Sequence, residues 1–300
     1  MKIKRREFLK SSALGLGGVL TGCKLGGADT PKTTYYDPYE KVALGKTGIK
    51  VSRVCIGTGM RGGNRESNQT RMGKEKFETL LRGAYERGVW VYDLADLYGT
   101  HPYVFPALKG IPRKDYFVIS KIWFRPGGIP DKDRLDADVV INRFLKEMNT
   151  DYIDLVLLHC VTSAKWPQEL EKQMEIMARF KQKGIIRAHG VSCHSIEALE
   201  AAANSPWVDS VHTRINPYGM SMDGPTDKVV PVLQKLHAAG KAVVGMKIIG
   251  EGRLRNDDEK KDESVRYVMN LGCVDILNVG FEKLEEVDDF AGRVRRVQRA

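Results

Sequence analysis

Short apolar runs alternate with longer amphipathic stretches from residue 51 onward. Several runs are apolar at successive positions, as expected for parallel strands that are covered on both faces. We therefore predict strands at residues 51–57, 89–93, 116–121, 153–159, 187–192, 208–213, 241–247 and 274–280.

The stretches between these runs have apolar residues three and four positions apart, which is typical of helices packed on one side. The stretch 131–149 starts at Asp131, a suitable N-cap, and places Leu135 and Val139 on the same predicted face as Phe144. Helices are predicted at residues 73–88, 131–149, 167–184, 226–240 and 283–298.

Eight strands that alternate with helices in a chain of 300 residues predict an α/β fold, the (β/α)8 or TIM barrel. A doubly wound sheet is the alternative, and it would join its first strand to its first helix through a tight glycine-rich turn. The glycine-rich segment 57–63 is instead followed by a gap of about ten residues before the helix 73–88. This gap favours the barrel.

The first 22 residues resemble an export signal. Paired arginines in KRREFLK precede the run SSALGLGGVL, which is too short to span a bilayer. This order resembles a twin-arginine signal, and LTGC after it resembles a bacterial lipobox with Cys23 as the lipidated residue. We therefore predict a signal (1–22), a tether (23–40) and a barrel (41–300), held by a lipid anchor on the periplasmic side of a bacterial membrane. The alternative is a basic N-terminus with a chance cysteine.

The formal net charge of +10 belongs in part to this signal, which holds five basic residues and one acidic residue, a net of four positive charges. No basic stripe interleaved with aromatic residues is present, so we predict no nucleic-acid partner. The cysteines after Cys23 lie at or near predicted strands and form no Cys-x-x-Cys pair or metal-like spacing with histidine. We therefore expect buried free thiols and no metal site.

Four titratable residues stand at or just after the ends of three consecutive predicted strands. Asp93, Lys121 and His159 end their strands, and Tyr98 lies in the loop after Asp93. In a (β/α)8 barrel these strand ends meet at the active-site face. A charged group at the end of an apolar run is costly unless it is paired, so the four residues are expected to converge.

The chemistry of this set is proton transfer to an oxygen. A tyrosine with an ordinary pKa near 10 exchanges protons poorly at neutral pH, and a neighbouring ammonium lowers that pKa. An aspartate keeps the lysine charged, and a histidine can donate a hydrogen bond to a substrate oxygen. The set includes no nucleophile with an activating base, so proton delivery paired with hydride delivery to carbon is the reaction that needs it.

Five segments carry a resemblance to the aldo-keto reductase family. VALGKTGIKVSRVCIGTG (42–59) is similar to the family's opening segment, and YDLADLYG (92–99) to its Asp-x-Ala-x-x-Tyr-Gly signature. ISKIW (119–123), DYIDLVLLH (151–159) and IIRAHGVSCHS (185–195) resemble the strands that bear the family's lysine, its histidine and the serine that holds the nicotinamide carboxamide.

The resemblance implies an NAD(P)H-dependent oxidoreductase that reduces an aldehyde or ketone, or oxidises the alcohol, by hydride transfer. Tyr98 is then the general acid/base, Lys121 lowers its pKa, Asp93 partners Lys121, and His159 orients the carbonyl. The implied substrate is a small carbonyl compound or sugar. A nicotinamide-binding sensor or regulatory barrel anchored at the membrane is the alternative, motivated by changes at the cofactor positions.

The residues that the resemblance places at the cofactor are Gly57, Thr58, Ser192, Cys193, His212, Met246, Lys247, Gly250, Arg253 and Glu282. Cys193 and His212 stand where the family usually has asparagine and glutamine, and Met246 stands where an aromatic ring usually stacks on the nicotinamide. NADP(H) is the usual cofactor of the family. Glu282 and Glu286 lie where basic residues usually hold its 2′-phosphate, so we predict a weakened preference for NADPH and include NAD(H) as a candidate.

Five further residues near the predicted site have less specific roles. Trp123 and Trp166 follow catalytic strands, where they line the substrate pocket or pack in the core. Asp96 is interpreted as a cap or turn residue. His101 and His194 are expected at the surface or the rim of the site.

Overall fold

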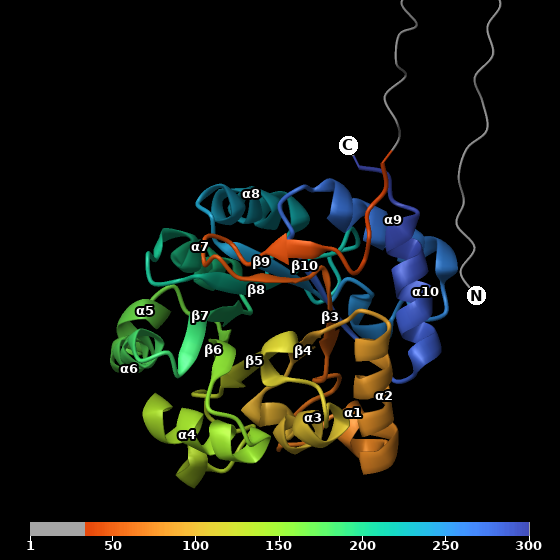
Figure 1. The fold of residues 1–300 in the computed structure, drawn as a ribbon. Coiled ribbons are helices and arrows are strands. Elements are labelled where there is room, and N and C mark those ends of the chain that lie inside the picture. Colours follow the sequence, from red (N-terminus) through yellow and green to blue (C-terminus); the bar gives the residue numbers. More distant parts are fainter. Residues whose placement is uncertain (1–33, 300) are drawn as a thin grey trace, which may run out of the picture. The chain divides into compact units, whose positions relative to one another are not determined.

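The structure, a computed structural model, describes residues 34–299. Within this range eight parallel strands close into a barrel in the order β10-β3-β4-β5-β6-β7-β8-β9 (Figure 1), which confirms the predicted (β/α)8 fold. The barrel strands are β3 (Val54–Gly57), β4 (Val91–Asp93), β5 (Phe117–Ile122), β6 (Ile153–Val161), β7 (Ile186–Cys193), β8 (Ser210–Arg214), β9 (Ala242–Met246) and β10 (Ile276–Gly280).

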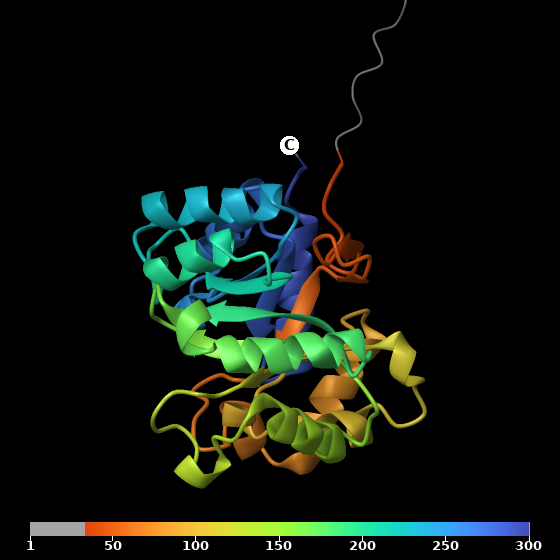
Figure 2. The ribbon, with the colours of Figure 1, turned by 90° about the vertical axis from the view of Figure 1, so that its left-hand side faces the viewer.

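Helices between the strands surround the barrel (Figure 2). The five predicted helices correspond to α2, α4, the pair α5 and α6, α8 and α10, whereas α1, α3, α7 and α9 were not predicted individually. The helices are α1 (Asn68–Arg71), α2 (Lys74–Glu86), α3 (His101–Ala107), α4 (Ala137–Met148), α5 (Trp166–Glu169), α6 (Glu171–Gln182), α7 (Ile196–Asn204), α8 (Thr226–Ala238), α9 (Asp258–Asn270) and α10 (Leu284–Arg295).

The start of α4 corrects the sequence prediction. Asp131 belongs to a short 3-10 turn, and the residue before the helix is Asp136. Leu135 and Val139 are each 48% exposed, while Phe144 is fully buried. The buried face of α4 is therefore rotated from the predicted one, because Leu135 precedes the helix and Val139 lies on its outer side.

The predicted strand 51–57 is two strands. β1 (Lys41–Ala43) pairs antiparallel with β2 (Lys50–Ser52), and β3 begins after Arg53. The hairpin side chains Leu44 and Val51 are fully buried and pack with the inner residues of the barrel. Lys46 in the hairpin donates a backbone hydrogen bond of 2.8 Å to Gly240, just before β9, so the hairpin, red-orange in Figure 1, lies at the amino ends of the strands.

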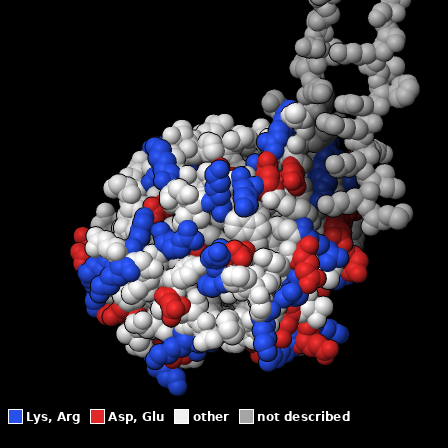
Figure 3. Space-filling model, in the orientation of Figure 1, with Lys and Arg blue, Asp and Glu red and all other residues white. Residues whose placement is uncertain are grey.

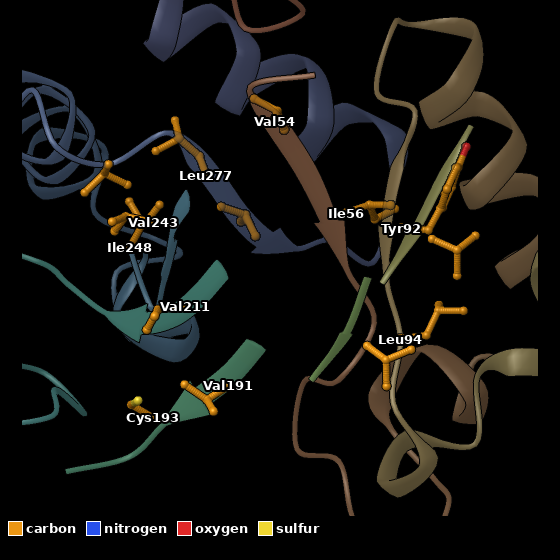
Figure 4. Close-up of a cluster of buried hydrophobic side chains, with 14 of the residues drawn as sticks. Val54, Ile56, Tyr92, Leu94, Val191, Cys193, Val211, Val243, Ile248 and Leu277 are labelled. Carbon is orange, nitrogen blue, oxygen red and sulfur yellow. The ribbon is translucent and has the colours of Figure 1, made fainter. Parts of the chain in front are cut away.

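Side chains alternate between the two faces of each strand and divide the core into two layers. The inner layer, from β3 to β10, includes Cys55, Phe117 and Leu157. The outer layer packs the strands against the helices, and Figure 4 shows part of it, with Val191 and Cys193 on β7. The cysteines Cys55, Cys160, Cys193 and Cys273 are buried and free, as predicted.

The predicted tether overlaps the described part of the chain at residues 34–40. Tyr36 donates a backbone hydrogen bond of 3.1 Å to Val297, and Tyr36 and Tyr39 pack against the core. Residues 34–40 are therefore part of the packing around the barrel and not of a free tether. The predicted signal, Cys23 and the rest of the tether lie outside the described residues.

Charged side chains of both signs are interspersed on the visible part of the face in Figure 3. Many charges are paired along one helix, as Arg82 is with Glu86 (2.9 Å) and Arg293 with Asp289 (2.9 Å). Among the described helices, none is both long and apolar enough to cross a membrane.

Candidate active site

The ion pair Asp93–Lys121 lies inside the barrel at the carboxyl ends of β4 and β5. Lys121 Nζ is 2.5 Å from Asp93 Oδ1 and also donates to the carbonyl oxygen of Leu94 at 2.9 Å. Asp93 Oδ2 accepts a hydrogen bond of 2.5 Å from Nδ2 of Asn278 on β10. Burial disfavours ionisation of Asp93, but the charge of Lys121 and the neighbouring His212 outweigh it and hold the pKa of Asp93 well below its ordinary value.

Tyr98 lies on the 3-10 turn after β4, with its ring packed against Gly59. A Cβ atom at position 59 would collide with that ring, so only glycine permits this approach. The Tyr98 hydroxyl is 3.2 Å from His159 Nε2, and Lys121 Nζ lies over the tyrosine ring, 4.9 Å from its centroid.

Burial, and after it the negative charge of Asp93, raises the pKa of Tyr98 well above its ordinary value. The hydroxyl is therefore protonated at neutral pH in this structure. Lys121 was predicted to lower this pKa, but its ammonium faces the ring and the Asp93 carboxylate. The geometry thus presents Tyr98 as a proton donor.

His159 is neutral at physiological pH, because burial and then the charge of Lys121 lower its pKa well below the ordinary value. Its ring meets those of Tyr98 and Trp123 edge to face, with centroid distances of 5.4 and 5.3 Å. These contacts fix the ring, with Nε2 directed toward the Tyr98 hydroxyl.

Two arginines anchor the turn that carries Tyr98. Asp96, the first residue of the turn, is buried, and its carboxylate binds Arg65 Nε at 3.0 Å and Arg143 Nη2 at 2.7 Å. The interpretation of Asp96 as a turn residue agrees with this placement. The arginines were not predicted, since they lie on a distant loop and on α4.

The expectation that His101 lies at the surface or rim is wrong. His101 is 1% exposed, and its ring bridges Glu147 Oε2 (2.7 Å) and Ser120 Oγ (2.8 Å). Ser120 precedes Lys121 on β5, so this bridge supports the strand behind the ion pair.

A cavity of about 390 Å³ opens beside Asp93 and Tyr98 and extends over the ends of β9 and β10. Three of the residues predicted to contact the cofactor line this cavity, namely Gly57, Met246 and Lys247. Its far end is lined by charged residues, among them Arg255, Lys261, Lys283 and Glu286.

The other predicted cofactor residues are placed differently. Thr58 is buried and donates from Oγ1 to the backbone carbonyl of Asp93 at 2.8 Å. His212 is also buried, with Nε2 3.4 Å from Asp93 Oδ1, inside the barrel. Ser192 faces the interior, and its buried Oγ has no hydrogen-bond partner among the described residues.

Gly250 is buried and Arg253 is exposed, and neither lines the cavity. Glu282 lies just outside the cavity, where it binds Arg255 at 2.7 Å and Asn68 at 2.6 Å. Its carboxylate is thus satisfied by protein groups.

Cys193 and Trp166 belong to the outer layer of the core. Cys193 points away from the barrel interior (Figure 4), because it alternates with the inward-facing Ser192. Trp166 is 1% exposed and donates from Nε1 to the carbonyl of Ala198 at 3.2 Å. Of the two tryptophans, only Trp123 is in contact with a catalytic candidate.

Comparisons with known proteins place this geometry in a family. The model of the aldo/keto reductase family matches residues 53–289. The chain is 29% identical over 202 residues to the aldo-keto reductase YhdN of Bacillus subtilis, a match that covers 64% of this chain and 57% of that protein. The chain thus spans less than two thirds of this relative's length.

Solved structures share the fold. A Pseudomonas aeruginosa structure described as an aldo-keto reductase has a TM-score of 0.70 at 23% identity, with 86% of this chain and 96% of that chain covered. A Klebsiella pneumoniae aldo-keto reductase in complex with NADP and acetate has a TM-score of 0.63 at 18% identity, with 87% and 92% covered. The match across residues 53–289 is more than half of the sequence, and the chain therefore belongs to the aldo/keto reductase family.

Proposed function

We propose that this protein is an NADP(H)-dependent oxidoreductase that reduces an aldehyde or ketone, with Tyr98 as the proton donor. The observation that carries the proposal is the hydrogen-bonding pair of Tyr98 hydroxyl and His159 Nε2, 3.2 Å apart and beside the Asp93–Lys121 ion pair. A carbonyl oxygen that contacts both groups would receive two hydrogen bonds.

The nicotinamide cofactor would supply a hydride to the carbonyl carbon. Tyr98 would transfer its proton to the carbonyl oxygen, because its raised pKa keeps the hydroxyl protonated until charge develops on that oxygen. Neutral His159 would orient the oxygen. The Lys121 ammonium, which Asp93 holds in place, would stabilise the phenolate that remains, since it lies 4.9 Å from the centre of the ring.

The residues at the mouth of the barrel fit a ring that bears a carboxamide. Ser192 Oγ and Asn278 Oδ1 are buried polar atoms without partners in the described part of the chain, and an amide group offers both a donor and an acceptor. Met246 is half-buried and lines the cavity, where its apolar side chain could pack against the nicotinamide ring. Buried polar atoms are normally hydrogen-bonded, so these atoms favour a bound polar ligand.

NADP(H) is supported by the Klebsiella pneumoniae neighbour, which holds NADP. The expected weakening of NADPH preference rests on Glu282 and Glu286. In the structure Arg255 offsets both acids, with ion pairs of 2.7 and 3.5 Å. We therefore propose NADP(H) as the main cofactor, with NAD(H) as the second candidate.

The four-residue set favours an enzyme over the sensor, because a binding protein has no need to keep a proton donor aligned with His159. The experiment is a panel of aldehydes, ketones and sugars with NADPH and NADH, for the wild type and for Tyr98→Phe. We expect Tyr98→Phe to lose turnover by about a hundredfold or more while it still binds cofactor. Tyr152→Phe, at the other end of the barrel, is the control. A wild type that binds cofactor and reduces none of the panel would support the sensor.

We also propose that the protein is exported and held at the periplasmic side of a membrane by lipid on Cys23. This proposal rests on the sequence of residues 1–23 alone. The test expresses the full chain in a bacterium, fractionates the cells and measures the mass of the N-terminal peptide. Cys23→Ala should release the protein from the membrane fraction, and Thr30→Ala should not. Wild type found in the cytoplasm without added lipid mass contradicts the proposal.

A further inference from the structure

The loop after β5 carries an arginine that forms no ion pair within residues 34–299. Arg125 Nη1 contacts Cys160, at 3.4 Å from its carbonyl oxygen and 3.1 Å from its Sγ. Its side chain is exposed. A guanidinium has five donors in a planar fork, so most of its donors remain open to a ligand.

Arg125 lies beside the reacting groups. Cys160 follows His159 directly in the chain, and the Arg125 guanidinium is 5.9 Å from the centre of the Trp123 ring. That ring in turn packs edge to face on His159. Trp123 therefore contacts both His159 and Arg125, so a ligand on His159 that extends along this ring reaches Arg125.

The backbone at Cys160 is shaped to meet Arg125. Cys160 has φ +60°, a conformation that is rare for a residue with a side chain, and the pairing of β6 with β7 shifts register between Leu158 and Val161. Such bulges occur near active sites, where they redirect a side chain. Here both the carbonyl oxygen and Sγ of Cys160 face Arg125 and hold its guanidinium next to the end of β6.

The neighbouring cations have protein partners. Arg214 binds Asp223 at 2.6 Å, and Lys247 binds Glu251 at 2.7 Å. His194, also at the mouth, is neutral at physiological pH, because burial and then the charges around it lower its pKa to about 3. Of the four cations whose charges act on His194, only Arg125 has no carboxylate partner within residues 34–299.

We propose that the substrates are carbonyl compounds with an anionic group, a carboxylate or a phosphate, which binds Arg125 while the carbonyl oxygen binds Tyr98 and His159. This inference rests on the proposed carbonyl reduction and names its substrate class. Arginine binds both anions through paired hydrogen bonds, so the two anions are compared in the test.

The experiment compares two matched pairs of substrates. One pair is 4-carboxybenzaldehyde and methyl 4-formylbenzoate, and the other is D-glyceraldehyde 3-phosphate and D-glyceraldehyde. The measured quantity is the ratio of kcat/KM for the anionic and the neutral member of each pair. We expect the wild-type ratio to exceed about ten for at least one pair, and the pair with the larger ratio identifies the anion.

Arg125→Gln should lower that ratio about tenfold, and Arg125→Lys should retain part of it. Arg179→Gln on α6 is the matched control and should keep the wild-type ratio. Added salt should lower kcat/KM for the anionic substrate more than for the neutral one, a test that needs no variant. Ratios near one in the wild type, or a ratio that Arg125→Gln does not change, overturn the inference.

Calorimetric binding separates this inference from the proposed function. If no carbonyl compound is reduced, the proposed function fails, and the affinities of 4-carboxybenzaldehyde and D-glyceraldehyde 3-phosphate still decide the role of Arg125. Tighter binding to wild type than to Arg125→Gln supports an anion site, and equal affinities overturn it.

Discussion

Asn278 on β10 donates a hydrogen bond of 2.5 Å from Nδ2 to Oδ2 of Asp93 on β4. Lys121 on β5 occupies the other oxygen, so the carboxylate is held from two strands on opposite sides of β4 in the barrel order. This arrangement fixes the plane of the carboxylate. It also fixes the Lys121 ammonium, which contacts the ring of Tyr98.

Replacement of Asn278 by leucine should destabilise the protein and lower kcat. The variant leaves Asp93 Oδ2 buried without a donor, which costs about 1–3 kcal/mol. Urea unfolding and the kcat of carbonyl reduction measure the two effects. Asn204→Ala removes an exposed hydrogen bond to Lys235 and is the control. A variant Asn278→Leu that unfolds at the wild-type urea concentration contradicts the structural role.

Replacement of Lys121 alone by methionine should strongly lower the stability of the protein, because Asp93 loses its cation. Lys121→Met leaves the buried Asp93 carboxylate unpaired, at a cost of about 3–5 kcal/mol. Asp93→Asn in the same chain removes that charge, so the double variant should lose less stability than the sum of the single variants. Additive losses would show that the two groups are not coupled. Arg82→Met, in an exposed ion pair, is the control.

The catalytic set could be predicted because each member has a local signal. Asp93, Lys121 and His159 interrupt apolar strands at their carboxyl ends, and the barrel brings such ends together. Asn278 was missed, although an asparagine inside the apolar run 274–280 is itself a signal, since a buried amide needs a partner. Its partner lies 185 residues earlier, and the sequence alone gives no register to join them.

The cofactor positions were harder to predict because the side chains on a strand alternate between two faces. Ser192 faces the interior and Cys193 faces the helices. The resemblance to the family placed both residues at the cofactor, because a sequence match does not show which face of the strand each side chain occupies. The error at α4 has another cause: Asp131 starts a short 3-10 turn, and the helix itself begins only at Ala137.

The pH profile of reduction should be level around neutral pH and fall on the alkaline side. Tyr98 is active as an acid in its protonated form, and its raised pKa keeps it protonated around neutral pH. Asp93 stays ionised and His159 neutral, because both have lowered pKa values. Activity should fall only in alkali, where Lys121, whose pKa burial lowers, loses its proton.

Steady-state kcat at saturating cofactor and substrate, measured from pH 5.5 to 10.5, tests this profile. Oxidation of the alcohol needs the phenolate, so its rate should rise with pH over the same range. A loss of half the reductive activity near pH 7 would indicate a different proton donor.

His194 should make the protein sensitive to acid. Its pKa is about 3 in the folded protein, below the ordinary value of 6.5, so between these values the unfolded chain binds a proton that the folded chain does not. Stability should therefore fall as the pH drops through this window, by about 3 kcal/mol at pH 4 from this group alone.

His194→Gln removes this titration, and its unfolding free energy should depend less steeply on pH than that of wild type. Urea unfolding at pH 7 and pH 4.5 measures the difference, with the exposed His237→Gln as the control. Some slope should remain, because burial also lowers the pKa of His189 to about 4. A parallel pH dependence in His194→Gln and wild type contradicts the prediction.

The choice between the two cofactors should depend on how firmly Glu282 and Glu286 hold Arg255. Arg255 lines the far end of the cavity and is paired with both acids, at 2.7 and 3.5 Å. A 2′-phosphate there would have to compete with the two carboxylates for the guanidinium, whereas a 2′-hydroxyl could donate a hydrogen bond to one of them. The double variant Glu282→Gln, Glu286→Gln frees Arg255 and removes two negative charges. It should bind NADPH about tenfold more tightly relative to NADH than wild type does. Fluorescence titration with both cofactors measures the ratio, and Arg255→Gln in the double variant should cancel the gain. An unchanged ratio in the double variant would show that the 2′-position does not lie against Arg255.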